Sequence, residues 1–313
     1  MRLWIKRDDL SGLGAGGNKA RKLEFLCGEA LASGVDCLIT VGAEQSNHCR
    51  MTAAAGARLG LETHLVLSGD RPRRLVGNQL LARLFGAHLH FTGAPPAHWG
   101  ALEIARETLT DELIADGVHP LSIPIGGSTP VGALGYIVAF AEMMEQCAGL
   151  GIQPAAIVFP SSSGGTHAGL LAGRALWRAM GHAVPHIVAI GVAKGVVAGL
   201  PPVAELAAQA LSLIGSGGRC RVEEDDVEID PRWLGEGYAM PTTAADEAIL
   251  WGARHGGWVF DRTYSGKGFA GLLGNVADGR WAGRDVLFIH TGGLPAVFAD
   301  GGLPPVPETA GLP

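Results

Sequence analysis

The amino-acid sequence predicts an α/β protein whose parallel sheets are covered by helices on both faces. Short, continuous apolar runs, such as residues 35–41, 155–159 and 286–289, alternate with longer helical patterns along nearly the whole chain. Hydrophobic residues make up 47% of the sequence and charged residues 17%, which is enough apolar surface for a large core. A length of 313 residues indicates about two domains.

The chain begins with a short strand at residues 3–5 and continues through a glycine-rich turn into a helix. Asn18 is the predicted N-cap of this helix, and Gly34 its end. Further strands are predicted at residues 35–41, 63–67, 87–91, 119–125, 155–159, 186–192, 258–260 and 286–289. Helices are predicted between them at residues 48–59, 74–85, 99–115, 131–147, 166–180, 203–214, 243–255 and 268–276. Residues 201–235 interrupt the alternation, and their acidic run indicates a solvated excursion.

Composition excludes several classes of function. A formal net charge of -6 and a pI of about 6.0 give no basis for nucleic acid or an anionic membrane as partner. No uncharged apolar run is long enough to span a membrane, and the first residues do not form a signal-peptide pattern. The five cysteines are scattered, without metal-binding or redox spacing. We therefore expect free thiols, no metal site and a cytoplasmic location.

The glycine-rich turn and the helix that follows it, residues 14–26, carry the candidate reactive group. Lys19 falls in the first helical turn, and Lys22 lies about one turn later on the same face. The positive end of the helix dipole and partial burial both disfavour a protonated amine, so they lower the pKa of Lys19. A neutral amine can form a Schiff base with an aldehyde. Two solvated surface lysines are the alternative interpretation of this stretch alone.

Loops that follow strands carry other candidate groups, because ligands of open α/β sheets bind at the carboxyl ends of the strands. Residues 42–49 place Ser46, Asn47 and His48 at a helix start, where free backbone amides attract a carboxylate. Residues 160–169 are rich in small hydroxyl and glycine residues, which suits a single phosphate group. For each loop by itself, an ordinary capped turn is the alternative interpretation.

The sequence resembles the 1-aminocyclopropane-1-carboxylate deaminase / D-cysteine desulfhydrase family over nearly its whole length. The matching motifs are Trp-Ile-Lys-Arg-Asp-Asp-Leu at residues 4–10, Gly-Gly-Asn-Lys-Ala-Arg-Lys-Leu-Glu-Phe at 16–25, Gln-Ser-Asn-His at 45–48, Ser-Gly-Gly-Thr-His-Ala-Gly at 163–169, Gly-Glu-Gly-Tyr at 235–238, Tyr-Ser-Gly-Lys at 264–267 and His-Thr-Gly-Gly at 290–293. The resemblance implies the tryptophan-synthase-β-like fold, fold type II, with two parallel-sheet α/β domains. The small domain would be residues 23–128, and the large, cofactor-binding domain residues 1–22 and 129–313. The cofactor would be pyridoxal 5'-phosphate, bound between them.

The resemblance also implies which residues hold this cofactor. Lys19 would bind it covalently, and Lys22 would contact its phosphate. The remaining phosphate contacts would come from the cup formed by Ser163, Gly164, Gly165 and Thr166.

The other matching residues are implied to act on the substrate and the cofactor ring. Ser46, Asn47 and His48 would hold the substrate carboxylate or the 3-hydroxyl of the cofactor. Tyr238 and Tyr264 would form an acid/base pair above the ring. The implied reaction begins when the substrate amine replaces Lys19 on the cofactor. Lys19 or Tyr264 then removes the Cα proton, and the β-substituent leaves.

Two positions indicate which reaction of the family takes place. The cyclopropane-opening deaminases carry Glu directly after the second tyrosine and Leu after the late histidine, where this chain has Ser265 and Thr291. Thr291 is accordingly a predicted cofactor contact. A hydroxyl group does not keep the pyridine nitrogen protonated as a carboxylate does, so the cofactor is a weaker electron sink. We therefore expect β-elimination by a carbon–sulfur lyase, with D-cysteine converted to pyruvate, hydrogen sulfide and ammonia.

Several alternatives stay open at this point. L-cysteate sulfo-lyases share the hydroxyl pattern and are the first alternative, and a ring-opening deaminase is the second. A non-catalytic protein that binds pyridoxal phosphate would leave the intact Lys19, Ser46 and Tyr264 unexplained, and a phosphate-binding protein without cofactor would give Lys19 no role. Relatives carry further residues before the first strand, so we expect effects on stability and dimerisation rather than on the catalytic motifs. A homodimer and a small amino-acid substrate are the expected partners.

Overall fold

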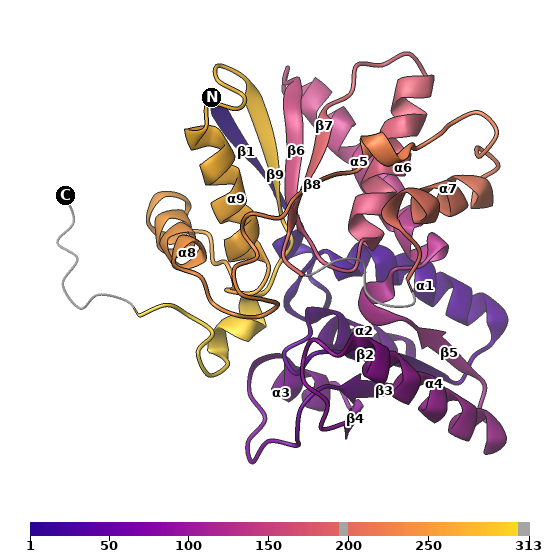
Figure 1. The fold of residues 1–313 in the computed structure, drawn as a ribbon. Coiled ribbons are helices and arrows are strands. Elements are labelled where there is room, and N and C mark those ends of the chain that lie inside the picture. The colour runs from indigo at the N-terminus through magenta and orange to yellow at the C-terminus, as the bar shows by residue number, and fades with distance from the viewer. Residues whose placement is uncertain (194–199, 306–313) are drawn as a thin grey trace.

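Two parallel sheets form the framework of the molecule, and each has helices on both faces (Figure 1). The computed structural model describes residues 1–193 and 200–305. One sheet has four strands in the order β4-β3-β2-β5, and the other has five in the order β1-β9-β6-β7-β8. Every described strand pair is parallel, as the continuous apolar runs predicted. The predicted α/β class is confirmed.

The four-stranded sheet is built from the early part of the chain. Its strands are β2 (Cys37–Gly42), β3 (Glu62–Leu67), β4 (His88–Phe91) and β5 (Pro120–Ile123). One face packs against α1 (Lys19–Ser33), α2 (Asn47–Leu59) and α3 (Gly77–Leu84). The other face packs against α4 (Trp99–Ala115). Short 3-10 helices η1 (Asp8–Leu10), η2 (Leu13–Ala15) and η3 (Ile125–Gly127) lie before α1 and after β5.

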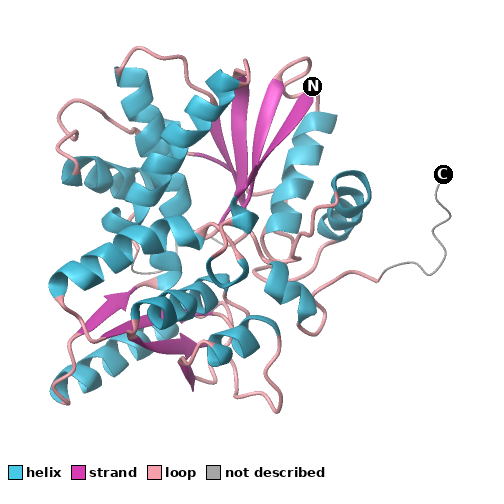
Figure 2. Cartoon of the chain, turned by 180° about the vertical axis from the view of Figure 1, so that it is seen from behind, coloured by secondary structure: helices cyan, strands magenta, loops and turns pink. Residues whose placement is uncertain are grey.

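The five-stranded sheet combines the first strand with the later part of the chain. Its strands are β1 (Arg2–Arg7), β6 (Pro154–Ser161), β7 (His186–Gly191), β8 (Glu228–Asp230) and β9 (Asp285–His290). One face packs against α5 (Pro130–Gly149), α6 (Gly165–Ala179) and α7 (Val203–Leu213). The other face packs against α8 (Thr243–Gly256) and α9 (Ser265–Ala277), which Figure 2 shows beside the chain start. Two more 3-10 helices are η4 (Glu224–Asp226) and η5 (Leu294–Phe298).

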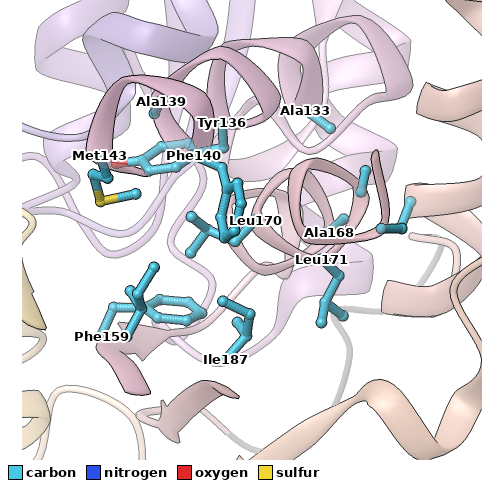
Figure 3. Packing of buried hydrophobic residues seen from close by; sticks show 14 of the residues in the cluster. Ala133, Tyr136, Ala139, Phe140, Met143, Phe159, Ala168, Leu170, Leu171 and Ile187 are labelled. Carbon is cyan, nitrogen blue, oxygen red and sulfur yellow. The ribbon is translucent and has the colours of Figure 1, made fainter. Parts of the chain in front are cut away.

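The largest apolar core lies between the five-stranded sheet and helices α5 to α7. Figure 3 shows Phe159 of β6 and Ile187 of β7 below Leu170 of α6, with Phe140 of α5 above. All four side chains are buried. Contacts of this kind fix the positions of the strand ends, and therefore of the loops that follow the strands.

Helix α1 is held against α5 and η1 by close packing and by a partly buried ionic network. A Cβ atom at Gly135 of α5 would overlap the carbonyl oxygen of Arg21, so glycine lets the two helices touch. Arg21 donates hydrogen bonds to Asp8 at 2.8 Å and to Glu142 at 2.8 Å. The Tyr136 hydroxyl donates to the same Asp8 carboxylate at 2.6 Å. The start of the lysine-bearing helix is thereby fixed.

Two predicted features of the large sheet are wrong. Residues 258–260 are not a strand but an irregular segment between α8 and α9, in which Phe260 packs against Phe269 and Phe288 instead of joining the ladder. The second error concerns residues 201–235, which were predicted to be a solvated excursion but contain strand β8 of the sheet. Its Asp230 is buried because Arg232, Trp233 and Asn275 satisfy its carboxylate.

The strands of the four-stranded sheet lie within residues 23–128, and those of the five-stranded sheet lie outside that range. Helix α1 crosses the predicted boundary after residue 22. The domain bounds remain a prediction, and residues 306–313 of the predicted large domain lie outside the described residues. In the part of the chain that the structure describes, no helix is long and apolar enough to cross a membrane.

Candidate active site

A cavity lies between the two sheets, where strands β2, β6 and β9 end. Its walls include Gly42, Ser161 and Thr291, which lie at or just beyond the carboxyl ends of these strands. The predicted site residues that line it are Lys19, Lys22, Ser46, Asn47, His48, Ser163, Gly164, Thr166, Tyr238, Tyr264 and Thr291. Gly165 is not a lining residue, but it lies between Gly164 and Thr166, which are. The structure thus brings together residues from six separate sequence motifs.

Lys19 is the first residue of α1, and its side chain faces the cavity. Burial lowers the pKa of this amine to about 8. Asn18 before it has a helical backbone conformation, with φ -59° and ψ -20°, and its side chain makes no capping hydrogen bond. It donates instead to Thr166 Oγ1 at 3.1 Å, so it joins the starts of α1 and α6. Asn18 therefore occupies the predicted N-cap position, but its side chain does not cap the helix.

Arg50 of α2 holds the glycine-rich turn before α1, and the sequence analysis did not identify it. Its buried guanidinium donates hydrogen bonds to the carbonyl oxygens of Gly14 and Gly16. Burial lowers the pKa of Arg50 to about 10. The turn is also held by the amide of Asn18, which donates to the Thr291 carbonyl at 3.0 Å. The only sequence indication was an arginine within an alanine-rich helix.

The cup of residues 163–166 at the start of α6, which is predicted to bind a phosphate, is closed by Lys22 and by Ser128. Ser128 is a second residue that the sequence analysis missed. Lys22 is 1% exposed, and its ammonium donates to the Gly126 carbonyl at 3.1 Å. Burial and the neighbouring Lys19 lower its pKa well below the usual value. Ser128 donates to Ser163 Oγ at 2.8 Å and accepts from the Gly165 amide at 3.2 Å. Its position after a glycine pair at a strand end was the available indication.

Glycine at position 165 is required by the shape of this cup. A Cβ atom there would lie 2.6 Å from Lys22 Nζ and 2.8 Å from Ser128 Oγ. Any side chain would therefore displace the ammonium that closes the cup.

The start of α2 contributes Ser46 and Asn47. The Ser46 hydroxyl caps the helix by accepting from the Cys49 amide at 3.1 Å, so its own proton is free to donate toward the cavity. The Asn47 carbonyl oxygen accepts from the Asn78 side chain at 3.0 Å. Ser46 therefore caps α2, as in the alternative interpretation of this loop, and it also lines the cavity.

His48 offers a hydrogen-bond acceptor, as its neighbours reveal. Thr40 Oγ1 lies 2.8 Å from His48 Nε2 and donates its single proton to the Ile123 carbonyl at 2.9 Å. With the Thr40 proton on the Ile123 carbonyl, the hydrogen-bond network assigns the ring proton to His48 Nε2. This leaves the buried Nδ1 as an acceptor with no partner among the described residues. Burial and the charges of Lys19 and Lys22 lower its pKa well below the usual value. In this tautomer, His48 Nδ1 accepts from a hydroxyl group and has no proton to donate to a carboxylate.

Tyr238 and Tyr264, the predicted acid/base pair, lie next to each other at one wall of the cavity. Their hydroxyl groups are hydrogen-bonded to each other. The edge of Trp99 packs against Tyr238 with ring centroids 4.8 Å apart. Burial raises the pKa of both phenols above the usual value, so both are protonated at neutral pH.

Ser265 does not line the cavity, in contrast to Thr291. Its side chain is fully buried and donates to the Asp261 carboxylate at 2.6 Å. The expectation that Ser265 presents a hydroxyl group to the cofactor ring is wrong for this arrangement, because Asp261 binds that hydroxyl on the far side of the wall. Asp261 was not identified from the sequence, because the helix was predicted to start at residue 268, whereas α9 starts at Ser265.

The charges around the cavity fit an anionic ligand. The amines of Lys19 and Lys22 line the cavity, and an anion beside them favours their protonated forms. The amino ends of α2 and α6 point toward the same space. No Asp or Glu of the described residues lines it. An amine able to bind an aldehyde and a glycine-lined cup for a dianion together fit pyridoxal 5'-phosphate. Within residues 1–193 and 200–305 no cluster of potential metal ligands is present.

The fold and this cavity define a fold-type-II enzyme that uses pyridoxal phosphate. The chain matches the model of the family described as pyridoxal-phosphate dependent enzyme over residues 1–292, and it belongs to the 1-aminocyclopropane-1-carboxylate deaminase / D-cysteine desulfhydrase family of such enzymes. Pyridoxal phosphate is the cofactor of this family.

Two curated relatives cover nearly the whole chain. One, from Pyrococcus abyssi, has the provisional name 1-aminocyclopropane-1-carboxylate deaminase; it is 39% identical over 95% of this chain and 86% of its own length. The other, a D-cysteine desulfhydrase of Salmonella choleraesuis, is 37% identical over 95% of this chain and 88% of its own length. The names of these two relatives refer to different substrates.

Solved structures agree with the fold. A crystal structure of an ACC deaminase homologue matches with a TM-score of 0.83 and 35% identity, over 96% of this chain and 86% of the other. A threonine deaminase from Solanum lycopersicum, in its processed form, matches with a TM-score of 0.60 and 15% identity, over 93% and 74% of the two chains, which shows the fold alone. The predicted family, fold and cofactor are confirmed.

Proposed function

We propose that this chain is a carbon–sulfur lyase that converts D-cysteine to pyruvate, hydrogen sulfide and ammonia. The observation that carries the proposal is the absence of carboxylates among the described residues that line the cavity. Bound pyridoxal phosphate acts as the sink for the electron pair left at the substrate Cα. Without a carboxylate beside its ring nitrogen that sink is weaker. Loss of a sulfur leaving group tolerates a weaker sink, whereas cleavage of a carbon–carbon bond does not.

Lys19 binds the cofactor and removes the substrate proton, and the cup of residues 163–166 binds the cofactor phosphate. Lys19 holds the cofactor aldehyde, and as a free amine it takes the proton from the substrate Cα. Its pKa of about 8 makes it an effective base near neutral pH. Lys22 neutralises the phosphate, and the cup that contains Gly165 surrounds it with backbone amides.

The start of α2 has the role of orienting the substrate. The free amides of its first turn and the Ser46 hydroxyl bind the substrate carboxylate. Asn47 and the acceptor Nδ1 of His48 contact the 3-hydroxyl of the cofactor, since His48 has no proton there to give a carboxylate.

The tyrosine pair has the role of the acid. As the Cβ–S bond breaks, its electron pair goes to sulfur, and a phenol proton from Tyr264 or Tyr238 is transferred to that sulfur. Both phenols carry a proton at neutral pH, so either one can donate to the departing sulfur. The released 2-aminoacrylate reacts with water to give pyruvate and ammonia, which balances the reaction.

The choice of D-cysteine is supported by the relative that is named for this activity and is 37% identical. An L-cysteate sulfo-lyase is the second candidate, because a cavity lined by Lys19 and Lys22 without acidic residues also suits a sulfonate. A ring-opening deaminase is the third, on the name of the Pyrococcus relative.

We also propose a homodimer in the cytoplasm. The five cysteines are buried free thiols, which is typical of a reducing compartment. Leu80 and Leu84 of α3 and Phe298 of η5 are exposed, and these two elements pack together, so they present apolar surface for a second copy.

Product analysis of the holoenzyme tests the proposed function. Equal amounts of D-cysteine, L-cysteine and L-cysteate are supplied, and pyruvate, sulfide and sulfite are measured. We expect pyruvate and sulfide from D-cysteine at the highest rate and neither product from the Lys19→Ala variant. Faster sulfite release from L-cysteate would replace this proposal by the second candidate.

A further inference from the structure

Asp261 is a buried carboxylate directly behind the tyrosine wall of the cavity. It is 1% exposed and lies between the irregular segment after α8 and the start of α9. None of its oxygens pairs with a lysine or arginine among the described residues. Its neighbour Arg262 pairs with Asp246 instead, at 2.7 Å through Nε. The charge of Asp261 is therefore balanced by hydrogen-bond donors of its own loop.

Those donors are the backbone amides that precede and open α9. Oδ2 accepts from the amides of Thr263 at 3.0 Å and Tyr264 at 2.9 Å. Oδ1 accepts from the amide of Ser265 at 2.9 Å and from its hydroxyl at 2.6 Å. In addition, the Asp261 amide donates to Ser265 Oγ at 2.8 Å. The peptide units on both sides of Tyr264 are thus held by one carboxylate.

A second loop closes over the same carboxylate. A Cβ atom at Gly293 would overlap Asp261 Oδ1, so the loop after β9 packs against Asp261 without a side chain between them. That loop also carries Thr291 in the cavity wall. Asp261 consequently links the tyrosine wall to the loop after β9, and it has little room to move.

We propose that Asp261 is a positioning residue, which fixes the backbone of Tyr264 so that its hydroxyl meets that of Tyr238 at the cavity wall. The inference rests on the proposed proton-donor role of Tyr264. Asp261 itself takes no part in the reaction. A displacement of a reacting group by about 1 Å costs about 100-fold in rate, so a carboxylate that fixes such a group affects turnover far more than substrate binding.

The test begins with hydrogen–deuterium exchange of the Asp261→Asn holoenzyme. Asparagine keeps one acceptor oxygen and replaces the other with a donor, so at least one pair of amide contacts is lost. We expect faster exchange in peptides that span residues 262–266 and unchanged affinity for the cofactor. Exchange identical to wild type in this segment would overturn the proposal. This measurement depends on no substrate.

The kinetic arm separates positioning from a general loss of stability. We expect kcat for D-cysteine to fall at least about 10-fold in Asp261→Asn, with KM within about 2-fold. The matched control is Asp230→Asn, a buried carboxylate with bonds to Arg232, Trp233 and Asn275 that is remote from the cavity. It should lose stability and keep kcat within about 2-fold of wild type.

A double-mutant cycle with Tyr264→Phe decides whether the effect passes through Tyr264. In the Tyr264→Phe background, Asp261→Asn should change kcat by less than about 2-fold, because the positioned hydroxyl is already gone. Equal losses in both backgrounds would overturn the proposal. Should Asp261→Asn fail to fold, Ser265→Ala removes only the hydroxyl contacts, and the same non-additivity with Tyr264→Phe is required.

Failure of the proposed function gives a different result. If wild type releases no pyruvate from D-cysteine, that function is wrong, and the cycle is measured with whichever amino acid is consumed fastest. The exchange result for residues 262–266 applies in either case.

Discussion

At the scale of single residues, Lys19 is an amine at the cavity wall with a lowered pKa. Burial lowers its pKa to about 8, so the neutral form becomes dominant as the pH rises through 8. We predict that the rate at which pyridoxal phosphate attaches to the cofactor-free chain rises with a midpoint near pH 8 and then levels off. Stopped-flow absorbance measures this rate. A rate that continues to climb toward pH 10 would indicate an ordinary lysine.

The position of attachment is checked separately by borohydride reduction and peptide mapping. The label should be on Lys19. A label on Lys22 or on Lys267, whose ammonium is already bound to the Leu234 carbonyl at 2.7 Å, would contradict the assignment.

Ser265 provides a second prediction at this scale. Glutamate at position 265 would lose the hydrogen bonds to Asp261 and place a second carboxylate beside it in a fully buried position. We predict that Ser265→Glu destabilises the fold by about 2–4 kcal/mol, because one of two adjacent buried carboxylates must be neutralised. Urea unfolding measures the loss.

The matched control is Thr108→Glu on the exposed side of α4, which should change stability by less than about 0.5 kcal/mol. If Ser265→Glu is as stable as this control, the new carboxylate does not lie beside Asp261, and the position assigned to Ser265 is wrong.

At the scale of elements, the cup at the start of α6 depends on a glycine. The Gly165→Ala variant would place a Cβ 2.6 Å from Lys22 Nζ and 2.8 Å from Ser128 Oγ, so both must move. We predict at least about a 10-fold loss of cofactor affinity, equal to about 1.4 kcal/mol. Titration of the cofactor-free chain with pyridoxal phosphate measures this value. Retained affinity would mean that the phosphate lies elsewhere.

The matched control is Gly28→Ala in α1. Nothing lies within 4 Å of a Cβ at this exposed helical position. Alanine should therefore stabilise the fold by about 0.5–1 kcal/mol and leave cofactor affinity unchanged.

The elements that the sequence predicts well are those with continuous apolar patterns. Strands such as β2 and β6 are buried on both faces, so their patterns are unambiguous. Strand β8 has only three residues, two of them acidic, and no local pattern reveals it. Residues 258–260 have a strand-like composition, but Phe260 is used for packing under α9. In both cases tertiary contacts decide the outcome.

The site residues also divide into those that local sequence patterns indicate and those that only tertiary contacts reveal. Lys19, Ser46 and the cup lie in loops after strands or at helix starts, where local chemistry indicates a ligand. Arg50 and Asp261 act on loops by hydrogen bonds to backbone groups, and backbone partners leave no trace in the sequence. Asparagine is a common N-cap residue, but the Asn18 side chain donates to Thr166 Oγ1 instead of capping the helix.

At the scale of the whole molecule, exposed apolar side chains predict the oligomeric state. Leu84 of α3 is 74% exposed and Phe298 of η5 is 73% exposed. We predict that the chain is a dimer in light-scattering measurements and that Leu84→Glu with Phe298→Glu yields monomers at micromolar concentration. The matched control is Ile104→Glu, at an exposed position of α4, and this variant should stay dimeric. A monomeric wild type would contradict this surface assignment.

The central claim is that a cavity without carboxylates supports β-elimination and not ring opening. The most direct measurement compares kcat/KM of one holoenzyme preparation for two reactions. These are pyruvate formation from D-cysteine and 2-oxobutanoate formation from 1-aminocyclopropane-1-carboxylate. We predict a ratio of at least about 100 in favour of D-cysteine, a difference of about 2.7 kcal/mol in transition-state stabilisation. Ring opening as fast as pyruvate release would contradict the claim.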